Sequence, residues 1–172
     1  RLGRGVPQDA KEAIKWFTKS AEQGDARAQF NLGVTYVDGQ VVPQDYKEAT
    51  KWFAQSAEQG DAKAQFNLGM IHRLGRGVPQ NDKEAFKWYR KSAEQGHAKA
   101  QLLLGVMYDQ GQVVPQDFKE AFKWFAKSAE QGNVLAQIKL GVMYDQGLGV
   151  PQNAKEAFKW FAKSAEQGNV LA

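Results

Sequence analysis

The side chains that could carry catalytic or metal chemistry are few in this sequence. It has no cysteine and only two histidines, His72 and His97, which lie in different copies of a repeated segment. A zinc site needs a cluster of cysteine, histidine or carboxylate ligands at set spacings, and the sequence contains no such cluster. We therefore expect no metal, no cofactor and no catalytic residue. His97 replaces a helix-capping Asp or Asn, and His72 replaces a packed Tyr.

Two further motifs could suggest nucleophilic catalysis or dinucleotide binding, and we reject both readings. A serine recurs in every copy, as Ser20, Ser56, Ser92, Ser128 and Ser164. A nucleophile needs a neighbouring base, and none recurs beside this serine, so we interpret it as a closely packed residue. The segment 75–77 (Gly-Arg-Gly) resembles part of a dinucleotide fingerprint. However, Gln80 stands where the third glycine belongs, and the segment follows a predicted helix where the motif requires a strand.

These residues are carried by a 36-residue unit that recurs along the chain. The prolines mark its period at Pro7, Pro43, Pro79, Pro115 and Pro151, and the tryptophans at Trp16, Trp52, Trp88, Trp124 and Trp160. A fixed period in this range is typical of a solenoid or array. We predict one array over residues 1–172, with complete repeats at 7–42, 43–78, 79–114 and 115–150 and partial repeats at 1–6 and 151–172.

Each unit divides into two predicted helices. Asn81 and Glu84 form a capping box, in which each side chain accepts a hydrogen bond from the other residue's backbone N–H. The same pair recurs as Asp9/Glu12, Asp45/Glu48, Asp117/Glu120 and Asn153/Glu156. The first helix is predicted over 82–95, stopping at Gly96 as a left-handed cap, and the second over 98–110. The fold class is therefore all-α, built from antiparallel helix pairs.

The apolar residues of the unit fit helices and not strands. On the first helix one face holds Ala85, Trp88, Tyr89, Ser92 and Ala93, and on the second Ala100, Leu104, Met107 and Tyr108. Gly105 lies inside the second helix, where glycine costs roughly 1 kcal/mol relative to alanine. It recurs as Gly33, Gly69 and Gly141, which predicts that a neighbouring helix approaches closely there.

Three short motifs carry a family resemblance. Each unit reads Ala-x-x-Trp followed by an aromatic residue, then Ser-Ala-Glu-Gln-Gly, then Ala-x-x-x-Leu-Gly, and it closes with Gly and Pro. The sequence resembles the Sel1-like repeat family, a relative of the tetratricopeptide repeat, over essentially its whole length. The resemblance implies a right-handed superhelix of antiparallel helix pairs that serves as a scaffold for protein partners. One branch of that family ties each pair with a disulfide, which this cysteine-free chain cannot form.

Both ends of the chain read as parts of flanking helices. Residues 1–6 repeat the sequence of residues 73–78, and residues 168–172 repeat residues 132–136. Neither end carries a polar capping helix, which solenoids generally need. We interpret the chain as a fragment of a longer array or as an idealised array designed from a near-consensus repeat. Uncapped ends also predict end-to-end self-association.

Composition leaves the compartment open. With 42% hydrophobic and 24% charged residues, the chain is typical of a soluble helical protein. No apolar run approaches the roughly 18 residues of a membrane span, and no pattern resembles a signal peptide. The family resemblance favours the bacterial periplasm or cell surface, while a cysteine-free chain is equally compatible with the cytoplasm.

Function is best sought where the copies differ. Three variable positions on the first helix lie four residues apart and so form one stripe. By resemblance to tetratricopeptide-like folds, this stripe borders the concave groove. The candidate partner-binding residues are Tyr46, Asp82, Phe86, Arg90, Phe118, Phe122 and Phe158. Asp82 and Arg90 lie about 12 Å apart along the helix at 1.5 Å per residue, so each could pair with a ligand charge. The alternative is that the aromatics pack between adjacent repeats.

A lysine row on the first helices suggests a second function. Fourteen of the 23 basic residues recur at helical spacing, namely Lys11, Lys15, Lys19, Lys47, Lys51, Lys83, Lys87, Lys91, Lys119, Lys123, Lys127, Lys155, Lys159 and Lys163. An anionic partner would suit the row, but the net charge is only +4, so a solvated face is the simpler interpretation.

We therefore predict a non-enzymatic scaffold that binds a protein or peptide in the groove. The alternative is that the lysine row forms a basic surface that binds nucleic acid or an acidic polymer. Of these two partners, we do not expect nucleic acid. A hydrolase, by analogy with the disulfide-bearing branch, has the least support.

Overall fold

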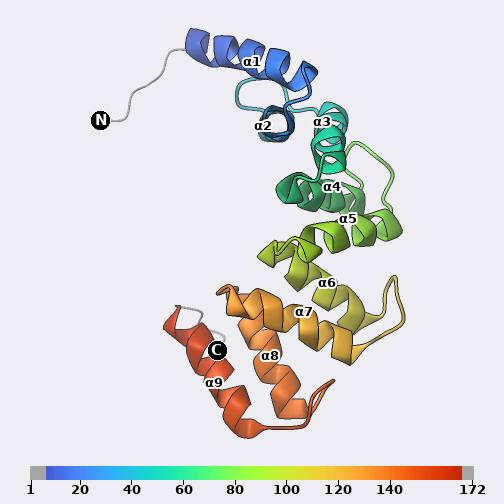
Figure 1. The fold of residues 1–172 in the computed structure, drawn as a ribbon, viewed down its shortest axis with the longest axis vertical. Helices are drawn as coiled ribbons and strands as arrows, with labels where there is room; N and C mark the ends of the chain where they lie inside the picture. The colour runs from blue at the N-terminus through green and yellow to red at the C-terminus, as the bar shows by residue number, and fades with distance from the viewer. Residues whose placement is uncertain (1–6, 168–172) are drawn as a thin grey trace. The chain divides into compact units, whose positions relative to one another are not determined.

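The chain forms a run of α-helices joined by short loops (Figure 1). The structure, a computed structural model, describes residues 7–167, and their side chains from residue 12 onward. The helices are α1 (Pro7–Glu22), α2 (Ala26–Asp38), α3 (Tyr46–Glu58), α4 (Ala62–Leu74), α5 (Asp82–Glu94), α6 (Ala98–Gln110), α7 (Phe118–Glu130), α8 (Val134–Gln146) and α9 (Ala154–Glu166). The described residues contain no strand, so the predicted all-α repeat class is confirmed. The proposed flanking helix parts at 1–6 and 168–172 lie outside the described residues.

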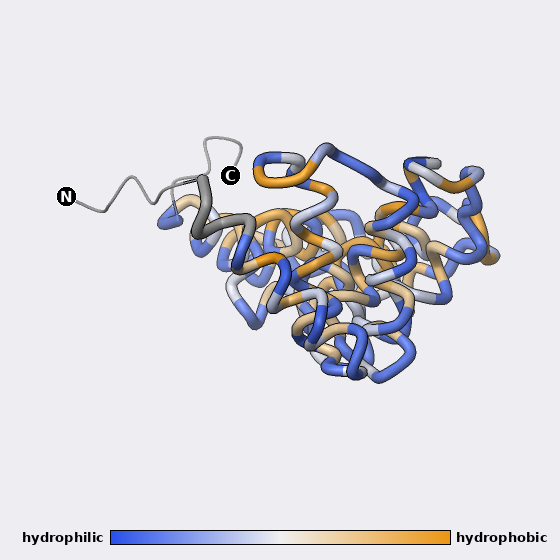
Figure 2. Tube along the Cα trace, turned by 90° about the horizontal axis from the view of Figure 1, so that it is seen from above, coloured by the Kyte–Doolittle hydropathy of each residue, from blue (hydrophilic) through white to orange (hydrophobic). Residues whose placement is uncertain are grey.

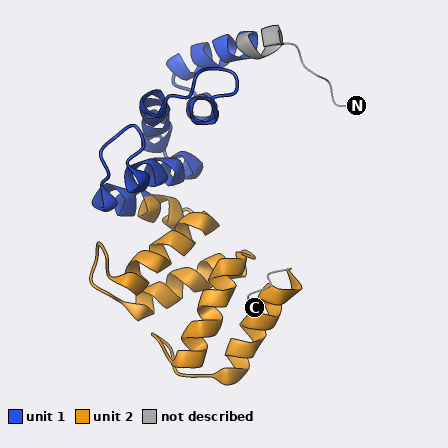
Figure 3. Ribbon diagram, turned by 180° about the vertical axis from the view of Figure 1, so that it is seen from behind, with its two compact units in different colours: residues 1–88 blue, residues 89–172 orange. Residues whose placement is uncertain are grey.

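The helices group into two compact units (Figure 3). Unit 1 covers residues 1–88, with α1 to α4 and the first half of α5, and unit 2 covers residues 89–172. Within unit 1, α2 packs against α1 and α3, and α3 packs against α4. Within unit 2, α7 packs against α6 and α8, and α8 packs against α9. Contact between successive helices is the packing pattern of a solenoid.

The first helices after α1 begin at the predicted caps. In α3, Oδ1 of Asp45 accepts hydrogen bonds from the backbone N–H groups of Lys47 (2.9 Å) and Glu48 (3.1 Å). The other half of the predicted capping box, in which the side chain of Glu48 accepts a hydrogen bond from the N–H of Asp45, is wrong. The N–H of Asp45 instead donates to the carbonyl oxygen of Tyr36 at 3.0 Å, because the preceding helix supplies an unpaired carbonyl there. Glu48 pairs with Lys51 instead.

The start of α1 also differs from the prediction. A cap at Asp9 implies a helix that begins after it, whereas α1 begins at Pro7. Proline is well suited to the first helical position, because its missing N–H has no partner in the first turn and its φ is already helical. The side chain of Asp9 lies outside the described side chains.

The predicted apolar faces form the core of each unit. In unit 1 the buried cluster contains Ala49, Phe53, Ala57, Ala64, Leu68, Ile71 and Trp88. In unit 2 it contains Ala121, Phe125, Ala129, Ala136, Leu140 and Met143. Apolar and polar residues alternate along the helices (Figure 2), as amphipathic helices with one buried face require.

A glycine inside each second helix permits close packing between repeats. A Cβ atom at Gly105 of α6 would lie only 2.6 Å from Cδ1 of Phe125 in α7, and one at Gly33 would lie 2.7 Å from Phe53. The aromatic ring therefore lies directly against the backbone of the preceding helix. This contact offsets the helix-propensity cost of glycine, and the predicted close approach is confirmed.

The tryptophans are buried to different extents. Trp88 is 9% exposed and Trp124 is 6% exposed, whereas Trp16 is 66% exposed. Trp52 packs against the cluster formed by α1 and α2, which shows that a first-helix tryptophan contacts the helix pair before it. Trp16 lies on α1, the first helix that the structure describes.

Buried serines and glutamines also join successive repeats. Oγ of Ser56 donates to the carbonyl oxygen of Ala26 at 2.7 Å, and a fully buried Ser128 bonds Ala98 in the same way at 2.8 Å. A parallel row joins glutamine side chains in the pairs Gln59–Gln29, Gln131–Gln101 and Gln167–Gln137. The recurring serine is thus closely packed, as predicted. Ser56 and Ser128 also carry a hydrogen bond between repeats that the sequence did not indicate.

Candidate functional site

We call the first-helix positions equivalent to Tyr46, Thr50 and Ala54 the variable stripe. Tyr46 is the first stripe residue of α3 and is half-buried. The guanidinium of Arg76 lies over its ring, with Cζ 5.3 Å from the ring centroid. Nη1 of Arg76 also donates a 3.2 Å hydrogen bond to the Tyr46 hydroxyl. Arginine and tyrosine therefore form one ordered surface pair.

The loop after α4 holds Arg76 in this position. Gly77 has φ +73°, and a Cβ atom there would lie 2.6 Å from the carbonyl carbon of Tyr46. Only glycine tolerates both the positive φ and this close approach. Gly149 has the same conformation, with φ +70°. The corresponding valines, Val41 and Val113, have no positive φ, so the loops differ in conformation.

A pocket of about 180 Å³ opens beside the Tyr46–Arg76 pair. Phe66, Met70 and Leu74 of α4 line its apolar side, and Tyr46 and Arg76 lie at its polar side. Leu74 is 49% exposed. The pocket therefore presents apolar surface to solvent next to a cation.

Sequence reasoning missed the α4 side of this pocket. We compared the copies at first-helix positions only. The second helices also vary, since Phe66 corresponds to Phe30, Leu102 and Ile138. In unit 2 the equivalent packing differs, because Lys139 of α8 approaches Asp109 of α6 with Nζ 3.8 Å from Oδ2. A scan of second-helix positions would have flagged α4, although not the geometry of Arg76.

Phe118 and Phe122 occupy the stripe on α7 in unit 2. Both pack against the core between α7 and α8. Phe122 meets Tyr144 edge-on, with ring centroids 5.3 Å apart at 88°. Phe122 therefore contacts Tyr144 of its own repeat. Residues of α6, in the preceding repeat, pack against the same cluster as Phe118 and Phe122. Both rings remain half-buried, so part of each is at the surface.

Asp82, Phe86 and Arg90 share one face of α5. Asp82 and Arg90 are exposed and Phe86 is half-buried. Nε of Arg90 donates to Oε1 of Glu94 at 2.9 Å, and this hydrogen bond and the carboxylate charge raise the pKa of Arg90. Arg90 therefore already has an anionic partner one turn away. The i, i+4 spacing of Arg90 and Glu94 was a signal in the sequence that could have predicted this pair.

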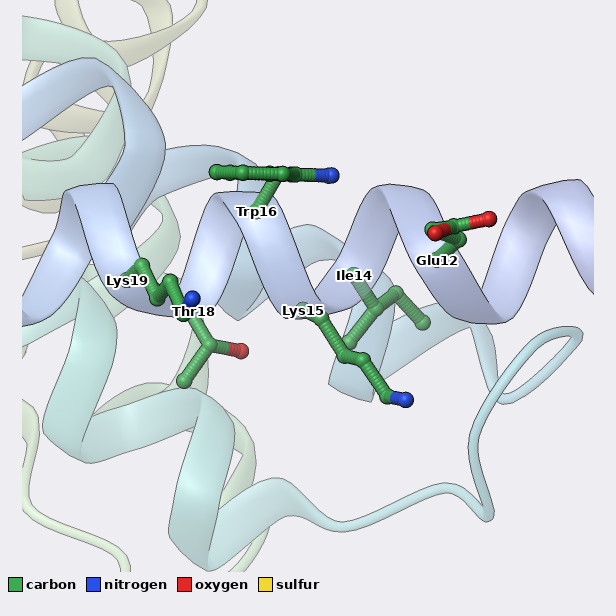
Figure 4. A pocket seen from close by; sticks show the side chains of 6 residues that line it. All are labelled: Glu12, Ile14, Lys15, Trp16, Thr18 and Lys19. Carbon is green, nitrogen blue, oxygen red and sulfur yellow. The ribbon is translucent and has the colours of Figure 1, made fainter.

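The last stripe aromatic, Phe158, is 75% exposed. It lies in a shallow hollow of about 480 Å³ on α9. A second hollow of about 410 Å³ lies on α1 (Figure 4), where Ile14 and Thr18 are the stripe residues. All residues lining each hollow come from a single helix. Nothing in the described part of the chain covers either surface.

Four lysines of the row form ion pairs with glutamates one turn earlier. The pairs are Lys51–Glu48, Lys87–Glu84, Lys123–Glu120 and Lys159–Glu156. The hydrogen bond and charge of Glu48 raise the pKa of Lys51. Other lysines lie over tryptophan rings, such as Lys127 with Nζ 4.7 Å from the Trp124 centroid. The row is therefore a mixed, solvated face and not an uninterrupted basic surface.

The two histidines, the first candidates for catalytic or metal chemistry, lie at structural positions. Nδ1 of His97 accepts a 3.3 Å hydrogen bond from the N–H of Ala100, so His97 caps α6 as predicted. His72 is half-buried near the end of α4, and its backbone carbonyl oxygen accepts from the N–H of Asn81. Its side-chain Nδ1 is buried and has no hydrogen-bond partner among the described residues. Residues 12–167 contain no group of three His, Cys, Asp or Glu side chains that could hold a metal ion. No helix in the part of the chain that the structure describes is long and apolar enough to cross a membrane.

Comparison with known families accounts for this architecture. The sequence profile of the Sel1 repeat matches five consecutive segments, at residues 1–25, 26–61, 62–97, 98–133 and 134–169. The chain belongs to the Sel1 repeat family. The last four Sel1 segments keep the 36-residue period but begin at the second helix of a pair, α2, α4, α6 or α8. A search of curated proteins found no match.

Solved Sel1 repeat structures resemble this one closely. One is c5321, a protective antigen of uropathogenic Escherichia coli with an SLR fold (TM-score 0.88, 41% identity, covering 92% of this chain and 34% of that one). Another is a Sel1 repeat protein from Oxalobacter formigenes (TM-score 0.86, 39% identity, 92% and 46% coverage). The Sel1 chain described here thus spans less than half the length of either. Helicobacter pylori cysteine rich protein B shares the fold (TM-score 0.58, 24% identity, 77% and 95% coverage).

Proposed function

We propose that this Sel1 repeat chain is a non-catalytic scaffold that binds a protein or peptide through the variable stripe. Sel1 repeat proteins are generally protein-interaction scaffolds. The residues proposed to contact the partner are Tyr46, Asp82 and Phe86 in unit 1, and Arg90, Phe118, Phe122 and Phe158 in unit 2. By analogy with tetratricopeptide-like folds, the first helices that carry them border a concave groove.

The observation that carries this proposal is the contrast between framework and stripe. The recurring residues are used in folding: Ser56 and Ser128 join repeats, and Gly105 admits the ring of Phe125. The stripe residues differ between copies and retain exposed surface, as Asp82 and Arg90 illustrate. Aromatic residues and arginine contribute disproportionately to binding energy at protein interfaces. Variation at such surface residues is what recognition of a particular partner requires.

The basic-surface alternative has weaker support. Binding of nucleic acid depends on lysines or arginines that are free to neutralise phosphates. Here a glutamate pairs with one lysine on each of α3, α5, α7 and α9. These pairs lower the positive potential of the row, so we place the partner on the stripe.

Selection from a displayed random peptide library against the immobilised chain would test the proposal. We expect selected peptides to lose roughly tenfold or more of their affinity for the Phe86→Ala/Arg90→Ala variant, as for truncation of interface anchors. Reversal of Lys119, Lys123 and Lys127 to glutamate is the matched control and should change affinity far less. Circular dichroism should show unchanged helix content in both variants. The opposite ranking, with a steep loss of affinity in salt, would place binding on the lysine row.

A further inference from the structure

We propose that the pocket beside Tyr46 and Arg76 binds one apolar side chain of a peptide, together with an acidic residue next to it. This proposal rests on the proposed peptide-binding function and identifies the class of peptide. The acidic group of the peptide contacts Arg76, and its apolar side chain contacts Phe66, Met70 and Leu74.

The size and lining of the pocket fit a single side chain. Its volume is about 180 Å³, and a cavity of about 150 Å³ lined by Leu, Ile and Phe is large enough for benzene. A leucine, methionine or phenylalanine side chain is therefore a suitable occupant. Leu74 is 49% exposed at the pocket, so an entering side chain would remove apolar surface of both partners from water.

Arg76 specifies the charge of the neighbouring residue. Its guanidinium has five N–H donors, and one donates to the Tyr46 hydroxyl. The ion pairs among the described residues do not include Arg76. Contact with the Tyr46 ring and hydroxyl fixes the guanidinium before a partner arrives, which lowers the entropy cost of binding. A carboxylate is the group that such a planar, ordered donor set binds best.

The arrangement belongs to this repeat among those described. Gln40, Gln112 and Leu148 occupy the position of Arg76 in the other loops. Leu148 packs against the core of unit 2 instead of presenting a charge. A second copy of the chain offers no excess of acidic residues to Arg76, because its net charge is +4. Charge complementarity therefore favours a distinct, acidic peptide.

The test is a fluorescence polarisation titration of the whole chain with labelled synthetic peptides. The probes are acetylated, amidated peptides of the form Gly-Ser-Asp-X-Asp-Ser-Gly, where X is Leu, Met or Phe. One control set replaces both Asp with Lys, and a second replaces X with Ser. We expect at least one acidic, apolar probe to bind saturably at or below about 1 mM. Each control should bind roughly tenfold more weakly, the effect of one charge-assisted hydrogen bond or a few buried methylene groups.

Variants separate this pocket from the rest of the stripe. Arg76→Gln should remove the preference for Asp over Lys, and Leu74→Ala should weaken all apolar probes without changing that preference. Arg27→Gln, which removes an exposed arginine of α2 outside the pocket, is the matched charge control and should have no effect. Both pocket residues are at the surface, so thermal unfolding should confirm that the variants remain folded.

The outcomes distinguish this inference from the proposed function. If no probe binds saturably, or if Arg76→Gln leaves the Asp preference intact, the pocket assignment is overturned. If library-selected peptides then still depend on Phe86 and Arg90, the stripe function stands without the pocket. If neither set of variants affects any peptide, both proposals fail.

Discussion

Oγ of Ser56 in α3 donates a 2.7 Å hydrogen bond to the carbonyl oxygen of Ala26, at the start of α2 in the preceding repeat. Ser56 is fully buried, so the bond joins two repeats inside the core of unit 1. The Ser128–Ala98 bond repeats this connection in unit 2 at 2.8 Å. In a solenoid, coupling between neighbouring repeats contributes a large share of stability. Loss of a single such bond should therefore lower the free energy of unfolding measurably.

Ser128→Ala should lower the free energy of unfolding by about 1–3 kcal/mol, because the carbonyl oxygen of Ala98 loses its buried side-chain donor. Ser164→Ala is the matched control, since the Ser164 hydroxyl bonds the carbonyl of Phe161 in its own helix. Urea unfolding followed by circular dichroism measures both. Equal effects of the two substitutions would show that the bond between repeats has no special role.

Gly105→Ala should destabilise the chain, although alanine is the better helix former. The new methyl group would meet the Phe125 ring at 2.6 Å, and overpacking of this kind costs about 1–3 kcal/mol. The double variant Gly105→Ala/Phe125→Leu should recover part of the loss, because leucine is smaller than phenylalanine. Without such recovery, contact with Phe125 is not the reason for the glycine.

Trp124→Ala should cost roughly 3–5 kcal/mol, as for truncation of other large core residues, because Trp124 is 6% exposed. Trp88, at 9% exposed, should behave similarly. Trp16→Ala should cost roughly 1 kcal/mol or less, as for surface positions. Acrylamide quenching of fluorescence in single-tryptophan variants would check the burial directly, and strong quenching of Trp124 would contradict it.

Single-stranded oligonucleotides should bind weakly, with a dissociation constant of about 10⁻⁴ M or weaker at physiological salt, as for non-specific electrostatic binding. The physical reason is that Glu48, Glu120 and Glu156 pair with lysines of the row. Filter binding of a labelled oligonucleotide at several salt concentrations measures this. Micromolar affinity with a steep salt slope would favour the basic-surface alternative.

The 172-residue chain should self-associate as its concentration rises. Trp16 is 66% exposed and Phe158 is 75% exposed, and burying such side chains against a second copy removes apolar surface from water. Size-exclusion chromatography with light scattering over a range of concentrations would detect the association. The variant Trp16→Lys/Phe158→Lys should reduce it, and a wild-type chain that stays monomeric throughout would contradict the prediction.

The sequence by itself determined the repeat period, the two helices per unit, their buried faces and the special position of Gly105. These features follow from local signals, because caps, left-handed glycines and helical periodicity act over only a few residues. The observed α5 and α6 end within one residue of the predicted boundaries. The stripe was also visible, since it consists of the positions at which otherwise similar copies differ.

Only the tertiary structure decided which groups meet across the loops. The N–H of Asp45 bonds Tyr36, Gln59 bonds Gln29, and Arg76 lies over Tyr46. The last two of these pairs are thirty positions apart, beyond the range of any local spacing rule. Whether they form depends on how closely neighbouring helices pack and on the loop conformation that Gly77 permits. For that reason the sequence predicted a surface for a partner, while the pocket within it required the packed helices.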